Sequence, residues 1–237
     1  GQLGDGSVTR RRTPVSVSGL TGVSDIAAGA FHTCALARSI AAYCWGRNDG
    51  GQLGLDKSTS SLALPGAVSV AGLAIAAGGA HTCVLTYIGP HCWGRNDRGQ
   101  LGDGSITDQH RPVPVRGLVQ PATAIALGNA HGCALLVSGE VRCWGAGTAG
   151  QLGSGSPRDE TLPVSALGLT GAAAIVAGFQ HSCALLADGS ARCWGDNAQG
   201  QLGQADGPRS TSPTVVTGLA QATALAAGAR HGCAVLA

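Results

Sequence analysis

Aromatic and charged residues are both scarce in this chain of 237 residues. Phe, Tyr and Trp together make up 3%, Met is absent, and charged residues make up 12% with a net charge of +2. The low net charge and the 44% hydrophobic content exclude an intrinsically disordered chain. The 39 glycines argue against a helical bundle, because each one weakens a helix interior. The only run of like charge is Arg10 to Arg12, so we expect no nucleic-acid partner.

Targeting signals are also absent from the sequence. The chain begins at Gly1, and no charged segment followed by an apolar one marks a signal peptide. The long uncharged stretch 161–187 is interrupted by Pro163, Gln180 and His181, so we expect no membrane insertion. Because the chain does not start with Met, we expect a processed form or a fragment of a longer protein.

The dominant feature of the sequence is an internal repeat. Gly-Gln-Leu-Gly begins at Gly1, Gly51, Gly99, Gly150 and Gly200, so neighbouring copies are 48 to 51 residues apart. His-x-Cys recurs at His32/Cys34, His81/Cys83, His131/Cys133, His181/Cys183 and His231/Cys233. Cys-Trp-Gly recurs at Cys44, Cys92, Cys143 and Cys193. The fixed order predicts one repeat domain, 1–237, with units 1–50, 51–98, 99–149, 150–199 and a partial 200–237.

Each unit contains four short apolar runs bounded by turn residues, which is typical of strands. In the fourth unit the runs are 163–166, 174–177, 181–186 and 190–194. Four strands in such a repeat indicate a propeller blade. The second run consists of small residues, which suit a crowded strand near a central axis. A parallel β-solenoid is the main structural alternative, although its repeats are usually shorter.

These motifs resemble those of the regulator of chromosome condensation (RCC1-type) repeat family. The resemblance rests on the Gly-x-x-His-x-Cys-Ala-Leu strand, the Cys-Trp-Gly strand and the Gly-Gln-Leu-Gly-Asp-Gly turn, and it covers the whole chain. It implies an all-β, RCC1-type β-propeller with four-stranded blades, commonly seven of them. Since this chain holds four complete units and part of a fifth, we expect an open arc or an incomplete ring.

Eight of the nine cysteines fall into one pair per complete unit. In the fourth unit, residues 187–189 (Ala-Asp-Gly) fit a three-residue hairpin loop with Gly in the left-handed conformation. This register sets Cys183 opposite Cys193 and Trp194 opposite the small Ser182. Directly opposed residues are close enough for a disulfide. We therefore predict the disulfides Cys34–Cys44, Cys83–Cys92, Cys133–Cys143 and Cys183–Cys193.

The first two units fit this hairpin less well. The first has Ile40 where the loop favours Gly, and the second is one residue shorter and contains Pro90. Other interpretations of the cysteines stay open, namely buried free thiols, zinc sites that combine His-x-Cys with the second Cys, and a catalytic Cys–His pair.

Disulfides are the favoured interpretation of the paired cysteines, and they indicate an oxidising compartment. We therefore expect an exported, bacterial-type family member in an extracellular or cell-envelope location. Cys233 lacks a second Cys in its unit. We expect it to be unpaired, bonded to another chain, or matched by further sequence, so that self-association through Cys233 or through open blade edges is a further expectation.

No motif in the sequence favours catalysis. The repeated His residues are interpreted as structural, each hydrogen-bonded to a neighbouring loop, and segments such as Asp103-Gly104-Ser105 are interpreted as turns, not calcium loops. An active site is rarely duplicated in every repeat. We therefore expect no enzyme activity, no cofactor and no metal.

The positions just before each repeated His vary from unit to unit, as contact residues do in repeat proteins. The resemblance implies that they share one face of the ring. The contact candidates are Ala30, Phe31, Asn129, Phe179, Gln180 and Arg230. Phe and Arg are residue types enriched at interface centres.

The variable positions favour a non-enzymatic scaffold that binds a protein partner. The alternatives are nucleotide exchange on a small GTPase, binding of carbohydrate or cell wall, and, ranked last, photoreception by clustered Trp. The cysteine pairs argue against intracellular exchange, and the shortage of exposed aromatic residues argues against stacking on sugars.

Overall fold

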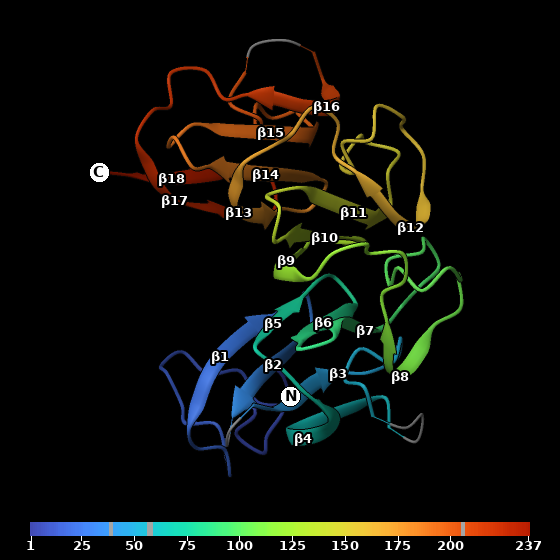
Figure 1. The fold of residues 1–237 in the computed structure, drawn as a ribbon. Coiled ribbons are helices and arrows are strands. Elements are labelled where there is room, and N and C mark those ends of the chain that lie inside the picture. The colour runs from blue at the N-terminus through green and yellow to red at the C-terminus, as the bar shows by residue number, and fades with distance from the viewer. Residues whose placement is uncertain (38–39, 56–58, 205–206) are drawn as a thin grey trace.

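The computed structural model describes residues 1–37, 40–55, 59–204 and 207–237, and its strands form five antiparallel sheets side by side (Figure 1). The first blade consists of β1 (Val23–Ala28), β2 (His32–Ala37), β3 (Ala41–Arg47) and β4 (Ser61–Ala71), and the second of β5 (Ala74–Ala77), β6 (His81–Thr86), β7 (Gly89–Gly94) and β8 (Gln109–Pro114). The third consists of β9 (Ala122–Leu127), β10 (His131–Leu136), β11 (Val141–Gly145) and β12 (Glu160–Ser165), and the fourth of β13 (Ala172–Ala177), β14 (His181–Leu186), β15 (Ala191–Asp196) and β16 (Arg209–Val215).

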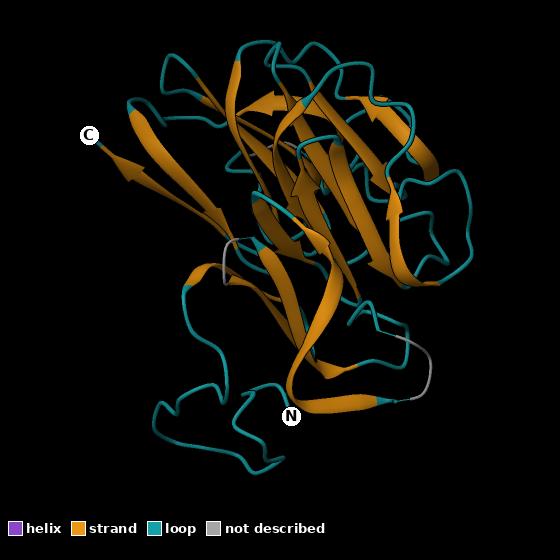
Figure 2. Cartoon of the chain, turned by 60° about the horizontal axis from the view of Figure 1, so that its bottom comes forward, coloured by secondary structure: helices purple, strands orange, loops and turns teal. Residues whose placement is uncertain are grey.

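The fifth sheet pairs β17 (Ala222–Ala227) with β18 (Gly232–Leu236), and these are its two strands in the described part of the chain. Figure 2 shows this hairpin extending from the end of the arc that carries the C-terminus. The architecture confirms the prediction of an all-β propeller arc with four complete blades and a partial fifth.

The small-residue strand lies at the inner edge of each blade, as predicted. Each complete sheet has its first strand at one edge, and the first strands of neighbouring blades contact one another along the series β1, β5, β9, β13 and β17. Short side chains such as Ala27 and Ala76 allow these strands to approach closely where the blades converge.

The blades are offset by one strand from the predicted sequence units. The first apolar run of the fourth unit, expected at 163–166, lies in β12 and pairs with β11 of the third blade, where Val164 lies opposite Cys143. After its third strand, the chain passes through Gly-Gln-Leu-Gly and returns along the outer edge of the sheet it has just left. Each complete blade therefore takes its outer strand from the unit that follows, because an antiparallel strand pairs most readily with the strand before it in the chain.

The predicted hairpin register is confirmed in the complete blades. Cys183 lies opposite Cys193 and Trp194 opposite Ser182, with the corresponding pairs in the other three blades. The structure contains the disulfides Cys34–Cys44, Cys83–Cys92, Cys133–Cys143 and Cys183–Cys193, with Cα–Cα distances of 4.0 to 4.1 Å. The second blade has the expected different hairpin, in which Thr86 lies opposite Gly89 and Leu85 opposite Pro90.

The hydrophobic core lies between adjacent blades. The first interblade cluster joins Cys44 and Leu53 to Ile75 and Trp93 of the second blade, and all four Trp side chains are at most 1% exposed. Each indole Nε1 donates a hydrogen bond to the backbone carbonyl of the Gln in the preceding Gly-Gln-Leu-Gly. The bonds are Trp45–Gln2 at 2.8 Å, Trp93–Gln52 at 3.0 Å, Trp144–Gln100 at 3.0 Å and Trp194–Gln151 at 2.9 Å. These bonds make the repeated turn the connection between neighbouring sheets.

Ile40 lies in the hairpin between β2 and β3, and we expect its replacement to make the folded chain more stable. Its φ of 84° matches the φ of 79° at Gly139 and 78° at Gly189, which hold the same place in the third and fourth blades. A left-handed backbone costs an L-residue about 1–2 kcal/mol, whereas Gly loses about 0.5–1 kcal/mol more conformational entropy on folding. Ile40→Gly is therefore expected to stabilise the chain by about 1 kcal/mol, measured by denaturant unfolding.

The matched control for this substitution is Ile88→Gly in the second blade. Ile88 is also an exposed hairpin residue, but its φ is not positive. Glycine there adds flexibility without relieving strain, so the unfolding midpoint is expected to stay or to fall. Equal midpoint shifts for both variants would contradict the proposed strain at Ile40.

No helix in the described part of the chain has the length and apolar character needed to cross a bilayer.

Candidate functional site: the loop face

The loops between the first and second strands of the blades lie on one face, which we call the loop face. It comprises residues 30–31, 79–80, 129–130, 179–180 and 229–230. Backbone amides link four of these loops in series, from Gly79 to the Asn129 carbonyl at 3.0 Å, from Asn129 to the Phe179 carbonyl at 3.2 Å, and from Phe179 to the Ala229 carbonyl at 3.3 Å. Each bond holds a variable loop directly against the loop of the next blade.

The chain has two Phe residues, and both are exposed on the loop face. Phe31 is 51% exposed and Phe179 is 47% exposed, while the Trp side chains are fully buried. The guanidinium of Arg47 lies 5.4 Å from the centroid of the Phe31 ring, within the range of a cation–π contact. An exposed aromatic ring held beside a cation is suited to contact with a partner.

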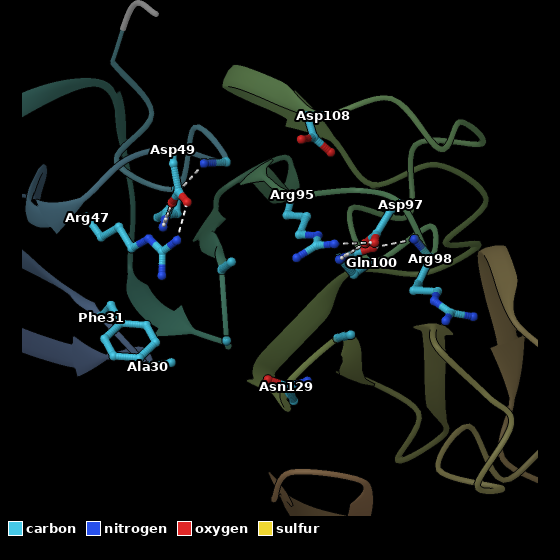
Figure 3. Close-up of a pocket in the computed structure, with 15 residues that line it drawn as sticks. Ala30, Phe31, Arg47, Asp49, Arg95, Asp97, Arg98, Gln100, Asp108 and Asn129 are labelled. Carbon is cyan, nitrogen blue, oxygen red and sulfur yellow. Dashed lines mark hydrogen bonds and ion pairs between the residues drawn. The ribbon is translucent and has the colours of Figure 1, made fainter. Parts of the chain in front are cut away.

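A cavity of about 590 Å³ opens on the loop face between the first three blades (Figure 3). Ala30, Phe31 and Asn129 line it, which brings together three of the six contact candidates. Phe179 and Gln180 lie on the next loop outside this cavity, and Arg230 lines a second cavity beside β18. The six candidates thus share a face but not a single pocket.

Three arginines that line this cavity each form an ion pair, two of them with a carboxylate that also lines it. Arg47 is ion-paired with Asp49, Arg95 Nη2 lies 2.7 Å from Asp97 Oδ2, and Arg98 Nη1 lies 3.1 Å from Asp159 Oδ2. The hydrogen bond from Arg47 lowers the pKa of Asp49. Partial burial raises the pKa of Asp97, but hydrogen bonds from Gln100 and Arg95 outweigh it, so the net pKa is lowered. The cavity therefore presents ionised groups of both signs at neutral pH.

Sequence reasoning missed the arginines of this cavity. Arg47 and Arg95 come directly after Cys-Trp-Gly, where the third and fourth units have Ala146 and Asp196. The loop candidates were identified because they vary from unit to unit beside a motif that does not vary, and the position after Cys-Trp-Gly varies in the same way. This signal could have identified these arginines as well.

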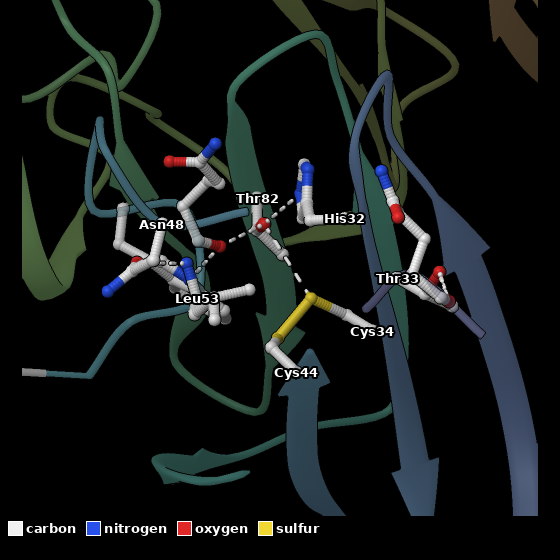
Figure 4. The surroundings of a disulfide bond; sticks show 10 residues. His32, Thr33, Cys34, Cys44, Asn48, Leu53 and Thr82 are labelled. Carbon is white, nitrogen blue, oxygen red and sulfur yellow. Dashed lines mark hydrogen bonds between the residues drawn. A yellow bond between two sulfur atoms is a disulfide. The ribbon is translucent and has the colours of Figure 1, made fainter. Parts of the chain in front are cut away.

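Four of the repeated histidines, His32, His81, His131 and His181, are buried between the blades, and two of these bond to a strand of the next blade. The fifth, His231, is exposed. His32 Nε2 lies 2.9 Å from Thr82 Oγ1, and that hydroxyl donates to the Gln52 carbonyl at 2.9 Å (Figure 4). His131 makes the same contact with Ser182 at 2.9 Å. Since Thr82 gives its proton to Gln52, it accepts one from Nε2 of His32, which defines the neutral tautomer of that ring.

The prediction that each repeated His bonds to a neighbouring loop is wrong, because the observed partners lie on a strand of the next blade. The partner is a strand hydroxyl where the next blade has Thr82 or Ser182. His81 and His181 face Gly132 and Gly232 at that place, and neither of their ring nitrogens has a hydrogen-bond partner. Burial lowers the pKa of His32 to about 4 and, with the repulsion of neighbouring histidines, lowers those of His81 and His131 to about 3.

The disulfides remove the cysteines of each complete unit from the possible metal ligands. Among the residues that the structure describes, no group of three or more His, Cys, Asp or Glu side chains could hold a metal ion. Cys233 is exposed and unpaired.

Comparison with known proteins agrees with this geometry. Residues 1–234 match the RCC1-like domain. The chain belongs to the RCC1-like domain family. Among curated proteins, the human probable E3 ubiquitin-protein ligase HERC4 is 36% identical over 169 residues, covering 68% of this chain and 16% of the ligase. The regulator of chromosome condensation of Xenopus laevis is 35% identical over 160 residues, covering 65% of this chain and 38% of that protein.

The fold of this RCC1-like chain is also found in solved structures. Yeast RCC1 (Prp20), solved bound to Kap60, superposes with a TM-score of 0.79 at 27% identity, covering 90% of this chain and 53% of the yeast chain. The chain thus spans about half of that structure and well under half of the two curated relatives.

Proposed function

We propose that this RCC1-like chain is a non-enzymatic scaffold that binds a protein partner through its loop face. The series of backbone hydrogen bonds from Gly79 to Ala229 carries this proposal, because it joins variable loops of successive blades into one continuous surface. Exposed Phe31 and Phe179 supply apolar anchors on that surface, and the adjoining cavity adds paired charges. The 27% identical yeast RCC1, solved with Kap60 bound, supports protein binding as the role of such a scaffold.

The four disulfides suggest that the chain works in an oxidising compartment. We extend this to an exported protein whose partner is extracellular or in the cell envelope. Nucleotide exchange on a small GTPase is a second candidate function, favoured by the 35% identity to the Xenopus laevis regulator of chromosome condensation. The disulfides weigh against it, since that activity belongs to a reducing compartment.

Replacing Phe31 and Phe179 together with Ala is expected to reduce partner binding at least tenfold. Loss of a central aromatic anchor commonly costs about 2 kcal/mol or more, and about 1.4 kcal/mol corresponds to tenfold in affinity. The measurement is quantitative recovery, by mass spectrometry, of proteins from extracellular and envelope fractions on the immobilised chain. Because both rings are about half exposed, the double variant is expected to keep its unfolding midpoint.

The matched control is Tyr87→Ala. Tyr87 is 77% exposed in the β6–β7 hairpin, at the end of β6 away from the loop face, so its loss is expected to leave recovery unchanged. Equal recovery on the double variant and on the unaltered chain would overturn the loop-face proposal. Recovery of a small GTPase whose GDP release the chain accelerates would favour the exchange candidate instead.

A further inference from the structure

The outer strand of the first blade differs from its counterparts in length and in charge. β4 spans 11 residues, whereas β8, β12 and β16 span 6 or 7. Those three strands contain Arg111, Glu160 and Arg209, while residues 59–94 of the chain contain no Asp, Glu, Lys or Arg. Charged side chains on an edge strand protect it from pairing with another chain. The outer edge of β4 lacks this protection.

The longer course of β4 leaves one backbone amide without its usual partner. In the other four repeats, the amide at the position of Ser69 donates to the carbonyl of the last Gly in the preceding Gly-Gln-Leu-Gly. The bonds are Ser18–Gly4, Arg116–Gly102 and Leu167–Gly153 at 2.9 Å and Thr217–Gly203 at 3.1 Å. Within the described chain, Ser69 makes no such bond to Gly54, and no residue of β3 lies opposite it. The Ser69 amide is therefore open to a strand from outside the blade.

Two adjoining cavities lie along this part of β4. The first, of about 350 Å³, is lined by Gly54 and Ser69 and lies where the other repeats form the amide bond. The second, of about 370 Å³, shares Ser69 and Pro112 with the first and extends to the β6–β7 hairpin. Tyr87 and Ile88 of that hairpin line it and are 77% and 88% exposed. The edge of β4 therefore adjoins large apolar side chains that the fold leaves uncovered.

We propose that two copies of this chain pair through the outer edges of their β4 strands and form a dimer. Residues 67–71 read Ala-Val-Ser-Val-Ala, which is the same sequence in both directions. In an antiparallel pair centred on Ser69, Ala67 lies opposite Ala71 of the second copy, and the two Ser69 residues lie opposite each other. Each Ser69 amide then donates to the Ser69 carbonyl of the other copy. A two-fold interface requires this kind of self-complementarity.

The same register suits the side chains of β4. Those at 67, 69 and 71 are small and exposed, whereas Val68 is 6% exposed and Val70 is half-buried on the other face of the strand. Pairing places Val68 opposite Val70 of the second copy, which extends the apolar row across the two-fold axis. The second copy also covers Tyr87 and Ile88, which line the same cavity as residues 69–71. This interface lies away from the loop face and does not depend on the function proposed for that face.

The test is sedimentation velocity of the chain with Cys233→Ser, a change that excludes dimers linked through that thiol. We expect the mass to rise from 23.3 kDa to twice that value as the concentration increases from about 1 to 300 µM. Ser69→Lys is expected to weaken the dimer by about tenfold or more, because two like charges then lie opposite each other at the axis. Ser69 is exposed, so this variant should keep the near-ultraviolet circular dichroism of the folded chain. A chain that stays monomeric over the whole range would overturn the proposal.

The matched control is Thr217→Lys, which places the same charge at the same position of the fourth blade. Thr217 is exposed and its amide is bonded to Gly203, so dimerisation should be unchanged. A second measurement tests the register: in the Cys233→Ser background, a short bifunctional maleimide should join two copies through Ser69→Cys and not through Thr217→Cys. A dimer that Ser69→Lys weakens no more than Thr217→Lys does, or equal cross-linking of the two Cys variants, would also overturn the proposal.

Discussion

Reduced in denaturant and then diluted into buffer with reductant, the chain is expected to remain unfolded. Each disulfide closes a loop of nine or ten residues. Restricting the unfolded chain by a ten-residue loop is worth about 2.7 kcal/mol at 25 °C, which gives about 11 kcal/mol for four loops. Total stabilities of about 5–15 kcal/mol are usual for a folded domain, so this loss is comparable to the whole.

The result is measured by near-ultraviolet circular dichroism, which reports the environment of the four buried Trp residues. The bonded cysteines are at most 5% exposed, so reductant alone should act slowly on the folded chain. Cys233→Ser is the matched control and should refold under oxidising conditions as the unaltered chain does. A reduced chain that regains the native spectrum, with a melting temperature within 5 °C of the oxidised one, would show that the bridges contribute little.

Acidification from pH 7.5 to pH 5 is expected to lower the melting temperature by about 12–24 °C. His32, with a pKa of about 4, and His81 and His131, with pKa values of about 3, are held neutral by burial, whereas an unfolded histidine has a pKa near 6.5. At pH 5 each of these three histidines therefore lowers the free energy of unfolding by about 2 kcal/mol, which gives about 6 kcal/mol in total. For a chain of this size, 1 kcal/mol corresponds to about 2–4 °C.

The direction of this effect follows from proton binding. Between pH 6.5 and the folded-state pKa values, the unfolded chain binds more protons than the folded chain, so lowering the pH favours unfolding. The stability supplied by these histidines is present above pH 6.5 and is lost as the pH falls toward 4 and then 3. Burial disfavours the charged imidazolium most strongly at His81 and His131.

His81→Leu is the variant that assigns the acid effect to these side chains. Neither ring nitrogen of His81 has a hydrogen-bond partner, so an apolar replacement removes the titration without breaking a bond. The variant is expected to lose about a third of the melting-temperature change between pH 7.5 and pH 5, measured by differential scanning calorimetry. A flat profile in the unaltered chain, or an unchanged profile in the variant, would contradict burial of neutral histidines.

Local features of the fold could be predicted from the residues because hairpin pairing is a short-range property. The loop at 187–189 sets which residues oppose one another, so the Cys183–Cys193 pair and the small residue facing Trp194 followed without knowledge of the other sheets. The second blade shows the same dependence, since its shorter hairpin was expected to differ and does.

The loop-face cavity could not be predicted in the same way. It forms where three blades converge, and Phe31, Arg95 and Asn129 come from three separate repeats. The unpartnered His81 likewise depends on the residue that the next blade places against it, here Gly132. Periodicity in the sequence identifies such positions as variable but does not state their distances.

The sequence by itself determined the repeat, the strands, the inner strand of small residues and the pairing of cysteines, because each depends on neighbours within a few tens of residues. Only the tertiary structure decided that β12 closes the third blade and that each indole binds the preceding Gly-Gln-Leu-Gly. These contacts join different repeats, and near-identical repeats carry no local signal that distinguishes contacts within a unit from contacts between units.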